Sequence, residues 1–151
     1  MMSPAIRSPK PGAESGQATV EFTLCFILFL LLIFLIVEGG RMIFYYDTVS
    51  HVAREGARFA IVRGTSSSCG TGCPASETDI SNFVKARAVG VSVKTVDVCW
   101  KTAPASACDK TPKGPGSIVQ VKVISDFDPV APIIPQGIIT LTSTTQMVIS
   151  Q

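Results

Sequence analysis

The stretch FTLCFILFLLLIFLIV, from Phe22 to Val37, decides the fold of this chain, because Thr23 is its only polar residue. Extended back to Ala18, it predicts a helix of about 30 Å at 1.5 Å per residue, which matches the hydrocarbon core of a bilayer. We favour a membrane span over a buried core helix because the segment from Leu30 to Val37 leaves no polar face.

The composition agrees with a membrane-anchored chain. Of 151 residues, 46% are hydrophobic and only 16% are charged, with a net charge of +2. A typical soluble domain is about 25% charged, so a highly solvated protein with a long charged tail is excluded. The charge is too balanced to indicate nucleic-acid binding. Residues 1–16 are polar and rich in Pro, Ser and Gly, and we expect them to be disordered.

A cleaved secretory signal is the main alternative to a permanent span. Such a signal needs small residues at a cleavage site just after the apolar run. The residues found there, Glu38-Gly39-Gly40-Arg41, match that requirement poorly, and the helical pattern continues through them. We therefore do not expect ordinary signal cleavage near Gly40.

A carboxylate, Glu21, stands one residue before the apolar run. A charge at the centre of a membrane costs roughly 3 kcal/mol on insertion scales. Either Glu21 lies at the interface and reaches water, or it has a specific cationic partner. Composition alone does not decide between the two.

The residues around Glu21 resemble a known processing site. Gly16-Gln17-Ala18-Thr19-Val20-Glu21-Phe22, placed between a basic leader and an apolar helix, resembles the cleavage site of prepilins of the Flp/Tad class. The resemblance implies that a prepilin peptidase cuts after Gly16 and that the mature chain begins at Gln17. It also implies that Glu21 pairs with the free N-terminal amine of a neighbouring subunit. The pairing would supply a counter-charge where each charge alone is costly.

The resemblance extends to TadE-like pilus assembly proteins over roughly residues 16–64. It rests on Val20-Glu21-Phe22 before the span, on Glu38-Gly39-Gly40-Arg41 after it, and on Ala53-Arg54-Glu55-Gly56-Ala57-Arg58 further on. Gly39 departs from the family pattern, which more often has a larger residue there. The family implies an inner-membrane protein with a periplasmic domain that works in assembly of an adhesive pilus.

The helical pattern continues beyond the membrane. Apolar and small residues recur at spacings of three and four, which predicts one helix from about Gln17 to Val62, ended by Gly64. The small-residue pairs Ala53/Ala57 and Gly56/Ala60 would let another helix or a sheet approach closely. Three charged residues form either a partner-binding face or a solvated helix surface: Arg54, Glu55 and Arg58. His51, the only histidine, is expected to be a surface residue rather than a metal ligand.

The remainder predicts a small α+β domain, with the long helix packed on an antiparallel sheet of three to four strands. Ser76 begins a capping-box-like start to a short helix that ends at Gly90. Valine-rich segments predict strands, and loops lie between them. The strands are expected at 91–98, 118–124 and 138–149, and the loops at 64–76, 100–116 and 128–137. The order of strands in the sheet is not deducible.

The chain has five cysteines, and the four downstream of the span indicate an oxidising compartment for this domain. Cys25 lies in the span, where it is an inert apolar side chain. Four cysteines downstream suggest two disulfides, and of the three connectivities we choose Cys69–Cys73 with Cys99–Cys108. A zinc site is the rival, but its usual C-x2-C spacing is absent.

The sequence contains no phosphate loop, nucleophile elbow, zinc-protease motif or dinucleotide fingerprint, so we expect neither an enzyme nor a cofactor. We expect a minor pilin or pseudopilin. The alternatives are an uncleaved membrane-anchored scaffold factor and a secreted binding module. The expected partners are prepilin peptidase, other pilins or pseudopilins, assembly-platform proteins and membrane lipid. The expected parts are a cytoplasmic leader (1–16), a transmembrane helix (17–40), its periplasmic continuation (41–63) and a periplasmic domain (64–151).

Overall fold

The computed structural model of the chain divides into two compact units, Met1–Val37 and Glu38–Gln151. The structure describes residues 14–65, 73–102, 107–111, 114–130, 137 and 139–150, with the side chains of Glu14 and Ser15 left aside. Most of the leader that was predicted to be disordered, and the centres of the loops at 64–76, 100–116 and 128–137, lie outside these residues.

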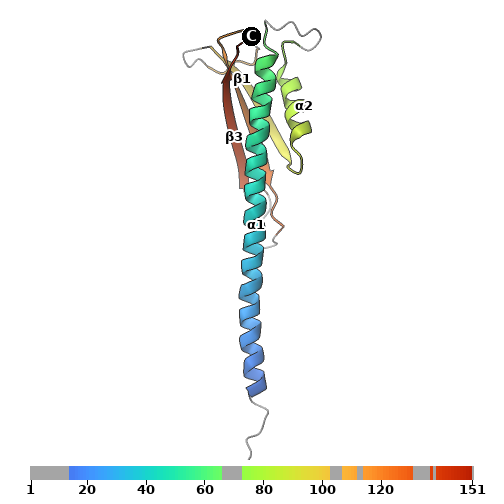
Figure 1. Cartoon of the computed structure of the whole chain (residues 1–151), viewed down its shortest axis with the longest axis vertical. Helices are drawn as coiled ribbons and strands as arrows, with labels where there is room; N and C mark the ends of the chain where they lie inside the picture. The colour runs from blue at the N-terminus through green and yellow to red at the C-terminus, as the bar shows by residue number, and fades with distance from the viewer. Residues whose placement is uncertain are drawn as a thin grey trace, which may run out of the picture. The chain divides into compact units, whose positions relative to one another are not determined.

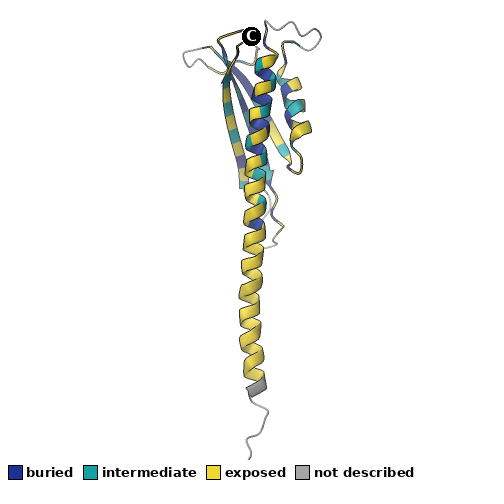
Figure 2. Cartoon of the chain, viewed as in Figure 1, coloured by how far each residue is buried: buried dark blue, intermediate teal, exposed yellow. Residues whose placement is uncertain are grey.

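The first unit contributes the beginning of a single helix, α1, which runs from Glu14 to Val62. The last residues of the leader are therefore helical rather than disordered, whereas the end at Val62 confirms the prediction. Residues 16–37 are all exposed, and Figure 2 shows this part of α1 as an unbroken exposed surface. Within the described residues, α1 is the one helix long and apolar enough to cross a membrane. This long apolar N-terminal helix indicates a membrane anchor.

The second unit combines the rest of α1 with a short helix, α2 (Glu77–Arg87), and a sheet. The strands are β1 (Val93–Lys101), β2 (Ile118–Phe127) and β3 (Ile139–Val148), and they pair antiparallel in the order β1-β2-β3. Ile118 faces Val148 at one end of the sheet, and Phe127 faces Ile139 at the other. This confirms the α+β class and supplies the strand order that the sequence left open.

Helix α2 begins as its sequence predicts. The Ser76 hydroxyl accepts a hydrogen bond from the backbone N–H of Asp79, and the Asp79 carboxylate accepts one from the N–H of Ser76, which forms a capping box. The Ser76 hydroxyl also donates to the Asp79 carboxylate at 2.7 Å, and this bond together with the one from the Ser76 N–H holds the pKa of Asp79 below its ordinary value. The helix ends at Arg87, three residues before the glycine expected to stop it, and Gly90 adopts a φ of +75° in the turn that follows.

Two strands differ from the prediction. β1 begins at Val93 rather than Val91 and continues through Trp100, which was expected to lie in a loop. Trp100 stays in the sheet because it pairs with Val119 on one side and exchanges two backbone hydrogen bonds with Asp109 on the other. β2 runs past Ile124 to Phe127, because alternate side chains continue to be buried to that point.

The core of the second unit lies between the two helices and the sheet. Figure 1 shows α2 beside the second half of α1, with the strands behind them. The stripe that α1 contributes is built mainly from valine and alanine, so the helix backbone can approach the sheet closely. The core residues come from α1 (Val49, Val52, Ala53, Ala57, Ala60), α2 (Ile80, Val84) and the sheet (Val96, Val98, Trp100, Val119, Val121, Val123).

Candidate functional site

The residues of the predicted processing site lie together on the exposed first part of α1. Gly16, Gln17, Glu21 and Phe22 are all exposed, and a Cβ atom added to Gly16 would meet nothing within 4 Å. The Phe22 ring stacks on Phe26 one helical turn further on, with 5.8 Å between ring centroids. Among the described residues, Glu21 has no hydrogen bond or ion pair. The described part of the chain therefore supplies no counter-charge for Glu21.

A second charged group, at the beginning of the second unit, is fully partnered. Glu38 accepts a hydrogen bond from the backbone N–H of Val130 at 3.0 Å, and its carboxylate lies 3.3 Å from Nη1 of Arg41. Arg41 in turn donates to the carbonyl oxygen of Asp128 at 3.2 Å, and its guanidinium lies 5.4 Å from the centroid of the Phe127 ring. We name Glu38, Arg41, Phe127, Asp128 and Val130 the exit cluster.

The exit cluster ties α1 to the chain that leaves β2. Only 11% of the Glu38 side chain is exposed. Because little water reaches this carboxylate, the Arg41 guanidinium and the Val130 N–H stabilise its negative charge. The sequence marks Glu38 and Arg41 as part of a motif. Their bond to residues about 90 positions away was not predicted, because nothing local in the sequence indicates it.

The small residues of the motif at Ala53–Arg58 pack inside the chain. A Cβ atom added to Gly56 would lie 2.5 Å from Cγ2 of Val84 and 3.5 Å from Cγ1 of Val121. At Gly56, side chains of α2 and β2 therefore pack directly against α1. Ala53 and Ala57 are also fully buried. The pairs Ala53/Ala57 and Gly56/Ala60 are thus occupied by α2 and the sheet of the same chain.

The charged residues of the same motif differ in whether they form an ion pair. Glu55 forms an ion pair with Arg87 of α2 at 3.3 Å. Arg54 and Arg58 are exposed, and neither forms an ion pair within the described parts of the chain. Together with His51 and Glu55 they line a depression of about 140 Å³. Arg54 and Arg58 remain the candidate partner face, whereas Glu55 already has a partner within the chain.

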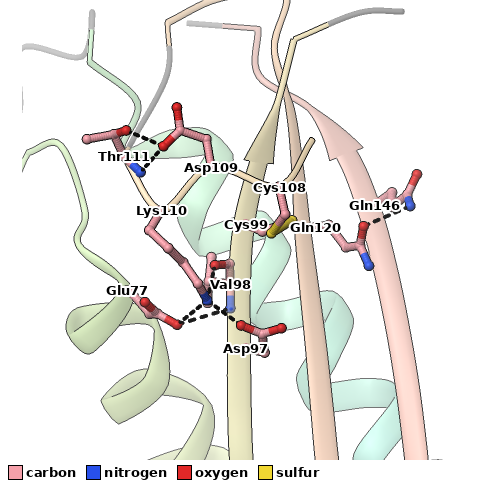
Figure 3. The surroundings of a disulfide bond; sticks show 10 residues. All are labelled: Glu77, Asp97, Val98, Cys99, Cys108, Asp109, Lys110, Thr111, Gln120 and Gln146. Carbon is pink, nitrogen blue, oxygen red and sulfur yellow. Dashed lines mark hydrogen bonds and ion pairs between the residues drawn. A yellow bond between two sulfur atoms is a disulfide. The ribbon is translucent and has the colours of Figure 1, made fainter. Parts of the chain in front are cut away.

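One of the two predicted disulfides is present. Cys99 of β1 is bonded to Cys108, with 5.3 Å between their Cα atoms (Figure 3). Cys73 is also disulfide-bonded, but Cys69 lies outside the described residues, so the pair Cys69–Cys73 stays a prediction. Cys25 is a free, exposed cysteine.

The disulfide loop is anchored beside α2 by Lys110. The Lys110 ammonium donates to Glu77 at 2.8 Å, to the carbonyl oxygen of Val98 at 3.0 Å and to the carboxylate of Asp97, as Figure 3 shows. The hydrogen bonds to Asp97 and Glu77 raise the pKa of Lys110 above its ordinary value. These contacts position the loop on the scaffold of the second unit.

Comparison with known proteins matches the N-terminal part of the chain to one family. The model of a family described as TadE-like protein matches residues 16–58. This confirms that the N-terminal segment resembles TadE-like proteins. The match includes the predicted processing motif, the Glu38–Arg41 pair and Gly56, and it ends before α2 and the sheet. No curated protein and no solved structure matches the chain.

Proposed function

We propose that this chain is a minor pilin or pseudopilin that takes part in assembly of a Flp/Tad-type adhesive pilus. In this proposal a prepilin peptidase cuts after Gly16, and the mature chain begins at Gln17. The observation that carries the proposal is the position of the Gly16–Phe22 motif. It stands at the start of the exposed apolar part of α1, inside the segment that matches the TadE-like family.

Glu21 would couple one subunit to the next. Its carboxylate is exposed beside an apolar segment and has no partner within the described residues. Cleavage after Gly16 would create a free amine at Gln17 of every subunit. A carboxylate and an ammonium that are each costly in a low-dielectric environment gain most when they pair with each other. The amine of a neighbouring subunit is therefore the partner we propose for Glu21.

The second unit would then lie in the periplasm, with the chain crossing the bacterial inner membrane once. The Cys99–Cys108 disulfide supports this orientation, because disulfides persist in oxidising compartments such as the periplasm. The proposed partners are prepilin peptidase, other pilins or pseudopilins and inner-membrane assembly-platform proteins. Arg54 and Arg58 offer a basic surface for such contacts. The proposed role is structural, with no catalytic step and no cofactor.

Two glutamate variants test the role of Glu21. Glu21→Gln removes the charge but keeps the size of the side chain, so it should abolish surface pili while membrane insertion stays intact. Glu14→Gln is the matched control, since cleavage after Gly16 would remove residue 14 with the leader. Pili are counted by electron microscopy of the native host, and membrane insertion is followed by fractionation. Normal piliation with Glu21→Gln would favour an uncleaved scaffold factor, in which Glu21 is incidental.

A further inference from the structure

Large apolar side chains are exposed at one end of the second unit, beyond the apolar run of the sequence. They come from three places: α1, the turn after α2 and the chain after β2. Their exposed fractions are high for valine, isoleucine and aromatic side chains. The five are Val89 (77%), Ile43 (72%), Val130 (71%), Tyr46 (56%) and Phe44 (55%), and we name them the apolar rim.

Two contacts place the three contributions at the same end of the unit. A Cβ atom added to Gly90, the neighbour of Val89, would lie 3.7 Å from the Phe44 ring. The backbone N–H of Val130 is bonded to Glu38, at the beginning of this unit of α1. The opposite end of the sheet, where Ile118 faces Val148, lies about 30 Å away at 3.3 Å per strand residue.

Of the charges next to the apolar rim, those of Glu38 and Arg41 are neutralised inside the chain, whereas the carboxylates of Asp47 and Asp128 are exposed. Glu38 is engaged by Arg41 and by the Val130 N–H, and Arg41 also bonds the carbonyl oxygen of Asp128. A partnered carboxylate is much less costly near lipid than an unpaired one. The exit cluster therefore permits the bilayer to extend past Glu38 and Arg41, to the apolar rim.

The lengths of the segments of α1 agree with a bilayer that extends to the apolar rim. The residues from Phe22 to Arg41 form about 30 Å of helix, enough for the hydrocarbon core. Met42 to Tyr46 add about 7.5 Å, which is close to the depth of one headgroup region. Tyrosine side chains such as that of Tyr46 are typical of that region.

We propose that the apolar rim is a lipid-contact surface, which lies in the headgroup region of the bilayer on the side of the second unit. The hydrocarbon core then covers residues 22–41 rather than 18–37, and Glu21 lies at the opposite edge. This contact adds a second attachment to the membrane besides the span. The inference rests on the membrane anchor and not on a role in pilus assembly.

Single tryptophans test the proposal in the full chain. Val89→Trp, Val130→Trp and the control Val148→Trp are each placed in nanodiscs of phosphatidylethanolamine and phosphatidylglycerol, with one chain per disc. All three valines are exposed, and Val148 lies at the opposite end of the sheet. The signal of the native Trp100, which is buried, is measured in the parent chain and subtracted. The probe is a lipid brominated on the acyl carbons next to the headgroup, which quenches tryptophans in contact with it.

The proposal expects Val89→Trp and Val130→Trp to lose most of their added emission, while Val148→Trp keeps its emission. Absence of quenching at either rim position would overturn it. Quenching at all three positions would also overturn it, because the whole unit would then lie on lipid without a defined surface. Shielding of the rim tryptophans from aqueous iodide, without quenching by the brominated lipid, would mean that protein covers the rim instead.

Discussion

Gly56→Ala should loosen the contact between α1 and α2. The added Cβ atom would lie 2.5 Å from Cγ2 of Val84, and Val84 is fully buried, so its branched side chain has little room to turn away. Overpacking of this kind costs roughly 1–3 kcal/mol. Alanine recovers up to about 1 kcal/mol of helix propensity relative to glycine. The net expectation is a loss of about 1–2 kcal/mol in the free energy of unfolding.

The assay is thermal unfolding of the full chain in detergent, followed by the fluorescence of Trp100, which is only 2% exposed and reports on the core. For a domain of about 100 residues, a loss of 1 kcal/mol lowers the Tm by roughly 4–8 °C. Gly40→Ala is the matched control on the same helix. A Cβ atom there would meet nothing within 4 Å, so the Tm should stay unchanged or rise.

A double variant separates overpacking from a general loss of stability. Val84→Ala removes the atom that the new Cβ would strike, at the cost of a small cavity. The combined variant Gly56→Ala/Val84→Ala should therefore be more stable than the sum of the two single losses predicts. Strict additivity, or a Gly56→Ala protein as stable as the parent, would refute the reasoning about close approach.

Two further predictions concern local features of the second unit. Ser76→Ala should cost about 1 kcal/mol of stability through loss of the α2 cap, measured by urea unfolding. The pKa of Asp79 is lower in the folded chain than its ordinary value of 3.8, so the ionised carboxylate stabilises the fold. This stabilisation is fully present above pH 3.8 and is lost as the pH falls through the folded pKa. Asp79→Asn should therefore flatten the dependence of the free energy of unfolding on pH in this acid range. Cys99→Ser should cost about 3 kcal/mol, because the disulfide closes a loop with a sequence separation of 9, and unfolding of the Cys108→Ser chain should give the same loss.

The features that the sequence predicted correctly depend on neighbouring residues. The Ser76–Asp79 capping box is a contact over three positions. The long apolar helix follows from residues 22–37 alone, and the Cys99–Cys108 loop is short. The motif around Gly16 is also confined to seven residues, and its processing stays a prediction. Local patterns of this kind can be interpreted without knowledge of the tertiary structure.

The features that were missed depend on partners far away in the sequence. Trp100 remains in β1 because Val119 and Asp109 flank it, and neither partner is indicated by the residues next to Trp100. The bond from Val130 to Glu38 joins positions 92 residues apart. The order of the strands also depends on long-range pairing. The close packing of Val84 against Gly56 could be predicted only once α2 was known to lie beside α1.

The central claim is that the chain is processed as a prepilin and assembled through its new N-terminus. The most direct test is the N-terminus of the protein, determined by intact mass on a C-terminally tagged chain expressed in its own host. Cleavage after Gly16 predicts a chain that begins at Gln17. A start at Met1 or Met2 would contradict it and indicate a permanent anchor, and a start near Arg41 would indicate an ordinary signal peptide.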